Sequence, residues 1–264
     1  KPEDALAPLA ATVLDPDEQV RMAAARALRA YGTAGAQPLL DHFATSDPVL
    51  REYYARALSV QGDEVLDLVA HLLSEGNVET RLAALQTLSY ALRPADQGTV
   101  ETCLVDDDVA VRCGACSALA RFGNRQAAEA LVEALGDSQE AVFDAAVEAM
   151  GALGDVAYEV LVPRLVRENG ELDERIVRAM AVAGDAAAPV LRECLTRDSV
   201  AVRAAAARAL FSVAGAEAAE DFLALLDDPA EPVRQVAVGS LQQIGPSVAG
   251  SALDVLRAGK LPGA

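Results

Sequence analysis

Lysine is nearly missing from this chain, which contains only Lys1 and Lys260. Its 22 basic residues are otherwise all arginine, and together with 40 acidic residues they give a net charge of −18. Proteins that bind nucleic acid depend on a basic surface that displaces counterions from phosphates. The composition therefore argues against a nucleic-acid partner. Lysine depletion with arginine retained is typical of a high-GC genome, and strong acidity is also a property of salt-adapted proteins.

Tryptophan is absent, and aromatic residues make up only 4% of the chain. Small aliphatic side chains dominate instead, which suits helices that cross at close range. No apolar run approaches the ~20 residues that a membrane-spanning helix needs. We therefore expect no membrane partner, and four thiols without a disulfide framework fit a reducing, cytoplasmic location.

The four cysteines form no pattern of a disulfide framework or a zinc site. Cys113 and Cys116 make a C-x-x-C, but no second pair follows, and we expect Cys113 to be the most accessible thiol. His42 and His71, the two histidines, belong to no metal or hydrolase motif, and no glycine-rich phosphate loop is present. The sequence thus predicts no metal, no cofactor and no catalytic residue.

What the chain does have is a repeat of 30 or 31 residues. The phrase VRMAAARAL at 20–28 returns as LREYYARAL at 50–58, VRCGACSAL at 111–119 and VRAAAARAL at 202–210. We call the second residue of the phrase the ladder position; in successive repeats it is Arg21, Arg51, Arg81, Arg112, Phe143, Asp173, Arg203 and Arg234. A period of this kind is typical of a solenoid, in which each repeat buries its core against its neighbours.

Each repeat predicts two helices. Between Asp15 and Gly32 the acidic start suits the positive end of a helix dipole, and apolar residues recur at spacings of three and four. Gly32 predicts a left-handed stop, because glycine adopts that conformation without a Cβ clash. A shorter apolar face follows at 34–45, and no strand-like alternation appears.

We therefore predict an all-α fold: a right-handed α-solenoid of about eight two-helix repeats and a closing C-terminal helix, in a single elongated domain over 1–264. The expected repeats are 2–32, 33–62, 63–92, 93–123, 124–154, 155–184, 185–215 and 216–245, with the closing helix at 246–258.

The pattern D-x-x-x-x-V-R-x-x-A-A-x-A-L-x-x-x-G resembles the HEAT-like repeats of the phycobilisome-lyase type, and the resemblance covers almost the whole chain. It implies a structural ladder in which each arginine bonds to the aspartate just before it. The positions that it assigns to the ladder are Asp15, Arg21, Arg51, Arg81, Asp106, Arg112, Asp198, Arg203, Asp228 and Arg234, with Asp107 as an alternative to Asp106. Phe143 and Asp173 interrupt the ladder, so we expect altered stacking within 140–175.

Five residues after the ladder position lies a second series, which we call the outer row: Arg26, Arg56, Gln86, Ser117, Glu148, Arg178, Arg208 and Gly239. In stacked helical pairs the second helices generally line the concave side, so these positions form a candidate recognition surface. Arginine binds carboxylates with two hydrogen bonds, which predicts an acidic peptide or helix as the ligand. The alternative is that each arginine pairs with an acid nearby in the same chain.

Unusual aromatic residues extend this candidate surface. Tyr53 and Tyr54 replace paired alanines, Phe143 replaces a ladder arginine, and Phe211 takes an outward position. Aromatic residues with arginine are the usual composition of interaction hot spots. The predicted partner-binding residues are Arg26, Tyr53, Tyr54, Arg56, Phe143, Arg178, Arg208 and Phe211. The alternative is that the aromatic side chains fill gaps left by small neighbours.

Three functions fit these observations. The first is a non-catalytic scaffold or adaptor that holds a protein or peptide partner along its concave face. The second follows from the resemblance and is a chaperone-like lyase that attaches a bilin chromophore. The third is a regulatory domain of a larger protein, since the sequence does not begin with methionine.

Overall fold

The computed structural model of the chain describes residues 2–166, 173–183 and 187–245, which form helices and contain no β-strand. Contacts divide the chain into two compact blocks, Lys1–Ala149 and Met150–Ala264, here called the N-terminal and C-terminal blocks. The all-α solenoid predicted from the sequence is confirmed. The single continuous domain stays a prediction, and the expected closing helix at 246–258 lies outside the described residues.

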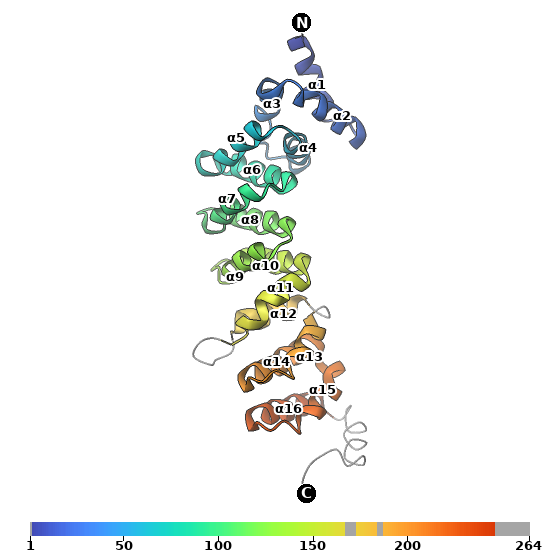
Figure 1. Ribbon diagram of the computed structural model, residues 1–264, viewed down its shortest axis with the longest axis vertical. Coiled ribbons are helices and arrows are strands. Elements are labelled where there is room, and N and C mark those ends of the chain that lie inside the picture. Colours follow the sequence, from blue (N-terminus) through green and yellow to red (C-terminus); the bar gives the residue numbers. More distant parts are fainter. Residues whose placement is uncertain (1, 167–172, 184–186, 246–264) are drawn as a thin grey trace. The chain divides into compact units, whose positions relative to one another are not determined.

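In the N-terminal block the helices alternate between first and second members of a repeat (Figure 1). The first helices are α1 (Leu6–Thr12), α3 (Gly32–Leu40), α5 (Asp63–Glu75), α7 (Gln97–Thr102) and α9 (Arg125–Ala134). The second helices are α2 (Glu18–Arg29), α4 (Pro48–Ser59), α6 (Val78–Ala91), α8 (Val109–Phe122) and α10 (Glu140–Leu153), in which the block boundary falls. Consecutive second helices from α2 to α8 contact one another, as stacking of repeats requires.

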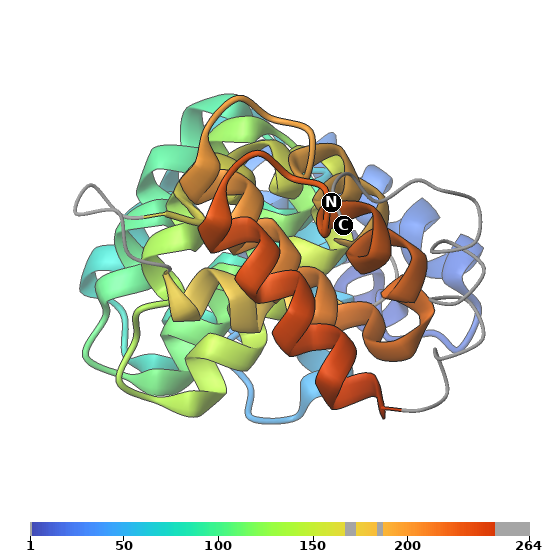
Figure 2. The ribbon, with the colours of Figure 1, turned by 90° about the horizontal axis from the view of Figure 1, so that it is seen from below.

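The C-terminal block repeats the scheme, and Figure 2 views it from the side of its last helix, α16. Its first helices are α11 (Asp155–Leu161), α13 (Ala188–Cys194) and α15 (Ala219–Leu225). Its second helices are α12 (Glu174–Ala183), α14 (Val200–Ala214) and α16 (Glu231–Ile244). Helix α14 contacts both α12 and α16.

Short polar side chains start the second helices. Asp17 accepts a hydrogen bond from the Gln19 amide at the start of α2, at 2.7 Å, and Asp47 accepts one from Val49 at the start of α4, at 2.8 Å. Each such bond satisfies an amide that would otherwise lack a helical partner. Aspartate side chains therefore cap the N-termini of α2 and α4.

Left-handed residues end several of these helices, and one of them is unexpected. Gly123 ends α8 with φ 66°, as the repeat predicts. In the third repeat the same position holds Leu92, which adopts φ 52° although its Cβ disfavours that conformation. The fold thus imposes the stop even where the sequence lacks glycine.

The core runs along the inward faces of the second helices. The large apolar residue seven positions after the ladder position is fully buried at Leu28, Leu58, Leu88 and Leu119 in the N-terminal block. Met180 and Leu210 are fully buried in the C-terminal block. Alanines such as Ala25 and Ala55 fill the space between, with no exposed area, so neighbouring second helices approach closely.

The ladder arginines bond in a way that differs from the pairing expected above. Arg112 donates to the main-chain carbonyl of Asp106, at 2.7 Å, and its carboxylate partner is Asp137 of the next repeat, also at 2.7 Å. Arg81 likewise donates to the Gly76 carbonyl and pairs with the Asp106 carboxylate at 2.8 Å. The residue five or six positions before these arginines therefore accepts through its main-chain carbonyl, and the carboxylate comes from one repeat further on.

The same geometry occurs in the C-terminal block. Arg203 donates to the carbonyl of Asp198 at 2.9 Å and binds Asp228 through two nitrogens. Arg234 donates to the carbonyl of Asp228 at 2.7 Å. The Arg203 guanidinium lowers the pKa of the Asp228 carboxyl, and Arg112 does the same for Asp137.

Carboxylates are missing from the equivalent place for the first two arginines. The residues 25 positions after Arg21 and Arg51 are Ser46 and Gly76, which offer no acid. Arg21 bonds to the carbonyl of Asp15 at 2.8 Å and lies over the Tyr53 ring, 4.1 Å from its centroid. Arg51 donates to the Thr45 carbonyl at 3.3 Å. These two arginines are thus held by main-chain oxygens without an ion pair among the described residues.

Two repeats depart from the ladder, as the sequence predicts. Phe143 is 4% exposed in place of an arginine. Asp173 lies just before α12, whereas the ladder position elsewhere lies inside the second helix. Its carboxylate accepts from the Arg175 amide at 3.1 Å and pairs with the Arg175 guanidinium at 3.0 Å. In this repeat the ladder position therefore serves to start the helix.

Candidate functional site: the second-helix face

The outer row lies on the second helices, and its arginines differ in their surroundings. Arg26, Arg178 and Arg208 are exposed, whereas Arg56 is half-buried. Arg56 pairs with Glu52 of its own helix and with Glu18 of α2, both at 2.8 Å. Among the described residues, the side chains of Arg26 and Arg208 have no hydrogen bond or ion pair. The alternative of pairing within the chain thus holds for Arg56 and not for these two.

Charge is unevenly divided between the two kinds of helix. Leaving aside the ladder position, arginines outnumber acidic residues on four second helices, α2, α8, α12 and α14, and on none of the first helices. The first helix α5 shows the contrast, since it carries four acidic residues and neither lysine nor arginine. Of the other second helices, α4 has one such arginine and one acid, α6 and α16 each have one acid and no such arginine, and α10 has three acids and no arginine. Arginine therefore concentrates on the second helices of a strongly acidic chain. We call the side of these helices that carries the outer row the second-helix face.

Tyr90 on α6 organises the middle of this face in the N-terminal block. Arg56 lies over its ring at 4.9 Å from the centroid, and Arg121 of α8 lies over it at 4.4 Å. The Tyr90 hydroxyl bonds to the Glu52 carboxylate at 3.2 Å. Contacts between guanidinium groups and aromatic rings are favourable, so three successive second helices are joined here.

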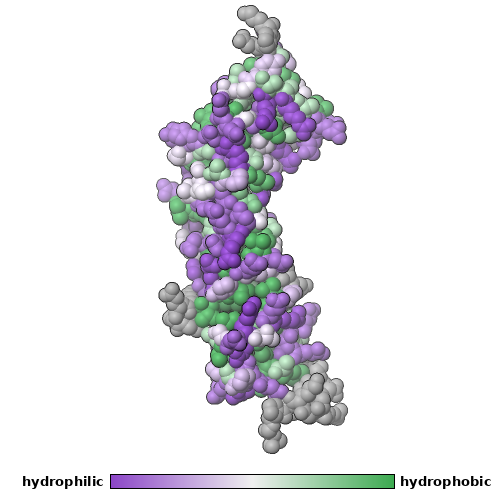
Figure 3. All heavy atoms as spheres, in the orientation of Figure 1, coloured by the Kyte–Doolittle hydropathy of each residue, from purple (hydrophilic) through white to green (hydrophobic). Residues whose placement is uncertain are grey.

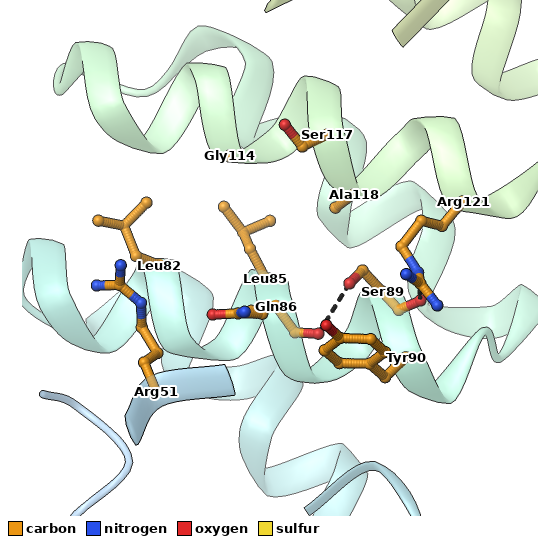
Figure 4. Close-up of a pocket in the computed structure, with 10 residues that line it drawn as sticks. All are labelled: Arg51, Leu82, Leu85, Gln86, Ser89, Tyr90, Gly114, Ser117, Ala118 and Arg121. Carbon is orange, nitrogen blue, oxygen red and sulfur yellow. Dashed lines mark hydrogen bonds between the residues drawn. The ribbon is translucent and has the colours of Figure 1, made fainter. Parts of the chain in front are cut away.

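A groove opens beside this cluster, between α6 and α8. Its volume is about 290 Å³, and no acidic residue lines it. Leu82, Leu85, Gly114 and Ala118 form its apolar part. In Figure 4 the groove residues extend from Arg51 at one end to Arg121 at the other. The remaining lining residues are Gln86, Ser89, Tyr90 and Ser117, and a bond of 2.8 Å joins the Ser89 hydroxyl to the Gln86 carbonyl (Figure 4).

A groove at the equivalent place lies between α14 and α16 in the C-terminal block. Its volume is about 430 Å³, and its lining includes Arg208, Phe211 and Gly239. Arg208 and Gly239 belong to the outer row, as do Gln86 and Ser117 in the first groove. The outer row, chosen from sequence alone, therefore marks the grooves between consecutive second helices in both blocks.

The predicted aromatic residues divide into two groups. Tyr54 and Phe143 are buried, at 8% and 4% exposure, so both must be removed from the candidate surface. They fill space in the core, which was the alternative drawn from the sequence. Tyr53 is half-buried under Arg21, and Phe211 lines the C-terminal groove with its ring centroid 6.2 Å from that of Phe222. These two remain at the surface.

Several residues of the face were missed by the sequence analysis. Tyr90 and Arg121 both lie nine residues after a ladder position, and Glu52 follows Arg51 directly. The repeat register shows that these positions point to the same face, but the residues there vary from repeat to repeat. The signal in the sequence for Tyr90 and Arg121 is an aromatic or basic residue nine positions after the ladder position.

Burial raises the pKa of the thiols on and near this face. Cys116 and Cys103 are buried, and desolvation raises the pKa of their thiols to about 12 and about 11. Cys113 is half-buried, with its pKa also raised by burial. His71 is exposed on α5, with its Nε2 3.2 Å from a Glu75 carboxylate oxygen. Within the described ranges no three histidine, cysteine or acidic side chains are placed to share a metal ion.

The exposed surface mixes hydrophilic areas with smaller hydrophobic ones (Figure 3). Among the described helices none has both the length and the apolar character needed to cross a membrane.

Comparison with solved structures finds proteins of low identity. The complex of CpcE and CpcF of phycocyanin lyase from Nostoc sp. PCC7120 is 22% identical, with a TM-score of 0.37, over 82% of this chain and 79% of that one. Human deoxyhypusine hydroxylase is 20% identical, with a TM-score of 0.34, over 92% and 96% of the two chains. A designed armadillo repeat protein in complex with the peptide (KR)4 is 16% identical, with a TM-score of 0.33, over 79% and 99%. At these scores none of the three supports a function for this chain.

No curated protein matches the chain. A family model of HEAT repeats, by contrast, matches residues 1–59, 97–181 and 158–242, which together make up most of the sequence. These matches span both blocks and agree with the paired helices and their repeating ladder. The chain therefore belongs to the family of HEAT-repeat proteins.

Proposed function

We propose that this protein is a non-catalytic scaffold that holds a protein partner through acidic segments bound to the second helices of its two blocks. The observation that carries the proposal is the concentration of arginine on those helices of a chain whose net charge is −18. A surface of this kind is built by stacked repeats before the partner arrives, so little ordering is needed on binding.

Arg26 and Arg208 give the proposal its most specific support. Both are exposed and lack side-chain partners among the described residues, so a carboxylate of the partner would not have to displace an acid of the chain. A guanidinium offers two parallel hydrogen bonds to a carboxylate, which gives direction as well as attraction. Arg178 is exposed in the same row, and Phe211 lies in the groove next to Arg208.

The non-catalytic part of the proposal is supported by the side chains themselves. Nucleophilic cysteines need a lowered pKa, whereas the pKa of all four thiols here is raised by burial. Neither histidine belongs to the second helices that carry the grooves.

The test is affinity capture from a lysate of the source organism with three forms of the chain. The second form carries Arg26→Glu and Arg208→Glu on second helices. The third carries Arg125→Glu and Arg192→Glu, two exposed arginines on first helices, and so has the same net charge as the second. A protein retained by the native and third forms and lost by the second supports the proposal. Equal retention by all three forms, or retention of no protein by any of them, contradicts it.

A further inference from the structure

We propose that the groove between α6 and α8 is a specific binding site for an acidic peptide segment of a protein partner. One apolar side chain of that segment inserts beside Leu82 and Leu85, and flanking carboxylates pair with Arg51 and Arg121. This inference rests on the proposed function and assigns a particular ligand chemistry to one part of the second-helix face.

At the apolar part of the groove a glycine of α8 lets two leucines of α6 approach closely. A Cβ added at Gly114 would lie 3.1 Å from a Leu82 methyl carbon and 3.3 Å from one of Leu85, which is closer than such atoms usually approach. Leu82, Leu85, Gly114 and Ala118 together line the apolar part of a groove whose volume is about 290 Å³. Removing apolar surface from water at such a place is favourable.

The ends of the groove carry the positive charge. Arg121 donates through its Nε to the Ser89 carbonyl at 2.8 Å and stacks on Tyr90, so its direction is fixed. Its two terminal nitrogens have no hydrogen-bond partner among the described residues. A carboxylate can therefore bind across both terminal nitrogens without disturbing the contacts that hold the side chain.

Arg51 is available at the other end because the ladder is incomplete there. Arg81 and Arg112 each bind an aspartate 25 residues further along the chain. For Arg51 the residue at that spacing is Gly76, which has no carboxylate. One terminal nitrogen of Arg51 donates to the Thr45 carbonyl, and among the described residues no acid pairs with the group. A ladder arginine that lacks its acid thus lines the groove.

Glu52, the acid that bonds to Tyr90, has no ion pair with Arg51 or Arg121. Glu52 receives a hydrogen bond from the Arg56 Nε at 3.0 Å and another from the Tyr90 hydroxyl. Glu52 thus pairs with Arg56, which also binds Glu18, and among the described residues neither Arg51 nor Arg121 has an acidic partner. A basic segment would meet like charges at both ends of the groove, whereas an acidic segment meets complementary ones.

The probe for this inference is a fluorescein-labelled nonapeptide with a central leucine, two glutamates on either side, and serines at both ends. Fluorescence anisotropy gives its affinity for the chain at physiological ionic strength. Two further peptides replace the leucine by serine or all four glutamates by glutamine. We expect each replacement to weaken binding at least tenfold. If the serine-centred peptide binds as tightly as the leucine-centred one, the inference that an apolar side chain inserts into the groove is wrong.

Two variants test the location. Ser117→Tyr places a large side chain into the groove, and Ser74→Tyr is its control, because Ser74 is an equally exposed serine whose hydroxyl bonds back to its own helix on α5. Arg121→Gln removes one charged end, and Arg125→Gln is its control on α9. We expect at least tenfold weaker binding for the two groove variants and unchanged binding for the controls.

Two outcomes overturn this inference and separate it from the broader proposal. Equal affinity of Ser117→Tyr and Ser74→Tyr, with both melting like the native chain, excludes the groove while leaving the rest of the second-helix face open. Failure of the native chain to bind the leucine-centred peptide also overturns the inference. The capture experiment with Arg26 and Arg208 is decided independently, because neither residue lines this groove.

Discussion

Arg203 and Asp228 meet through two hydrogen bonds, of 2.7 and 2.9 Å, although 25 residues separate them in the sequence. Both side chains are at most 10% exposed. The pair joins the start of one second helix to the turn before the next. The same spacing joins Arg112 to Asp137 in the N-terminal block, so each pair binds two neighbouring repeats together.

The first prediction concerns the stability that such a pair provides. Replacing Arg112 by alanine removes the guanidinium that donates to the Asp137 carboxylate and the Asp106 carbonyl, at a site that is largely buried. We expect the free energy of unfolding to fall by about 1–3 kcal/mol, as is typical when a buried polar group loses its partner. Urea unfolding followed by circular dichroism measures the change.

The control is Arg125→Ala, which breaks an exposed pair with Glu129 on one helix. Exposed pairs of this kind contribute about 0–1 kcal/mol, so the control should unfold nearly like the native chain. Equal losses in the two variants would mean that the ladder pair has no special structural role.

The second prediction concerns pH. Arg203 lowers the pKa of Asp228 in the folded chain below the ordinary aspartate value of about 3.9. The ionised carboxylate therefore stabilises the fold above that ordinary value, and this stabilisation is lost as the pH falls through the lowered pKa. We expect Asp228→Asn to lose stability at neutral pH and to show a weaker dependence on pH between about 4 and 2 than the native chain.

Unfolding curves in urea across that pH range provide the measurement. Asp227→Asn, at the exposed neighbouring position, serves as the control and should follow the native pH dependence. If the free energy of unfolding of Asp228→Asn changed with pH in the same way as that of the native chain, Asp228 would not be the source of the pH dependence.

The third prediction concerns the left-handed stop of α6. Leu92 adopts φ 52° where the other repeats usually have glycine. A side chain with a Cβ costs about 1–2 kcal/mol in this conformation, and glycine loses about 0.5–1 kcal/mol more entropy on folding. We expect Leu92→Gly to raise the free energy of unfolding by up to about 1 kcal/mol.

Thermal melting measures this effect, and we expect a higher melting temperature for Leu92→Gly. Gly123 has φ 66° at the equivalent position, so Gly123→Ala should lower the melting temperature. A lower melting temperature for Leu92→Gly would show that contacts of the leucine side chain outweigh the strain.

The fourth prediction concerns thiol reactivity. Three of the four cysteines are buried and Cys113 is half-buried, and burial raises the pKa of each thiol. Since the thiolate is the reactive form, iodoacetamide at pH 7.5 should label Cys113 first and more slowly than a free thiol. Mass spectrometry after timed labelling reads the order, and four labels should appear at once in denaturant. Faster labelling of Cys116 than of Cys113 would contradict the burial order.

The repeat register made much of the fold predictable. It located the second helices, their N-caps and most of their stops, because these depend on residues within one repeat, such as Asp17 and Gly123. It did not give the acid that each ladder arginine binds. The resemblance to known HEAT-like repeats implied that the arginine binds the carboxylate of the preceding aspartate. In the structure the carboxylate comes from one repeat further on, and Asp106, which precedes Arg112, accepts through its carbonyl.

The candidate site was predicted less completely. Four residues of the outer row line grooves, and a helical register places two of them, Gln86 and Ser117, on the same face. The groove itself depends on pairs of residues from two helices, such as Leu82 with Gly114, whose fit no single repeat reveals. Tyr54 and Phe143 were misassigned because the sequence does not tell whether a large residue in place of a small one turns inward or outward.

The division of charge between first and second helices has a consequence for how a partner arrives. At low ionic strength an acidic protein approaching from afar meets the whole charge of −18 and is repelled. At physiological ionic strength, fields are damped beyond about 8 Å, so the arriving molecule senses only the arginines directly beneath it. Moderate salt should therefore speed the encounter, although it weakens each contact once formed. The association rate would then pass through a maximum as salt is added, a behaviour opposite to the steady decline seen when partners carry net charges of opposite sign.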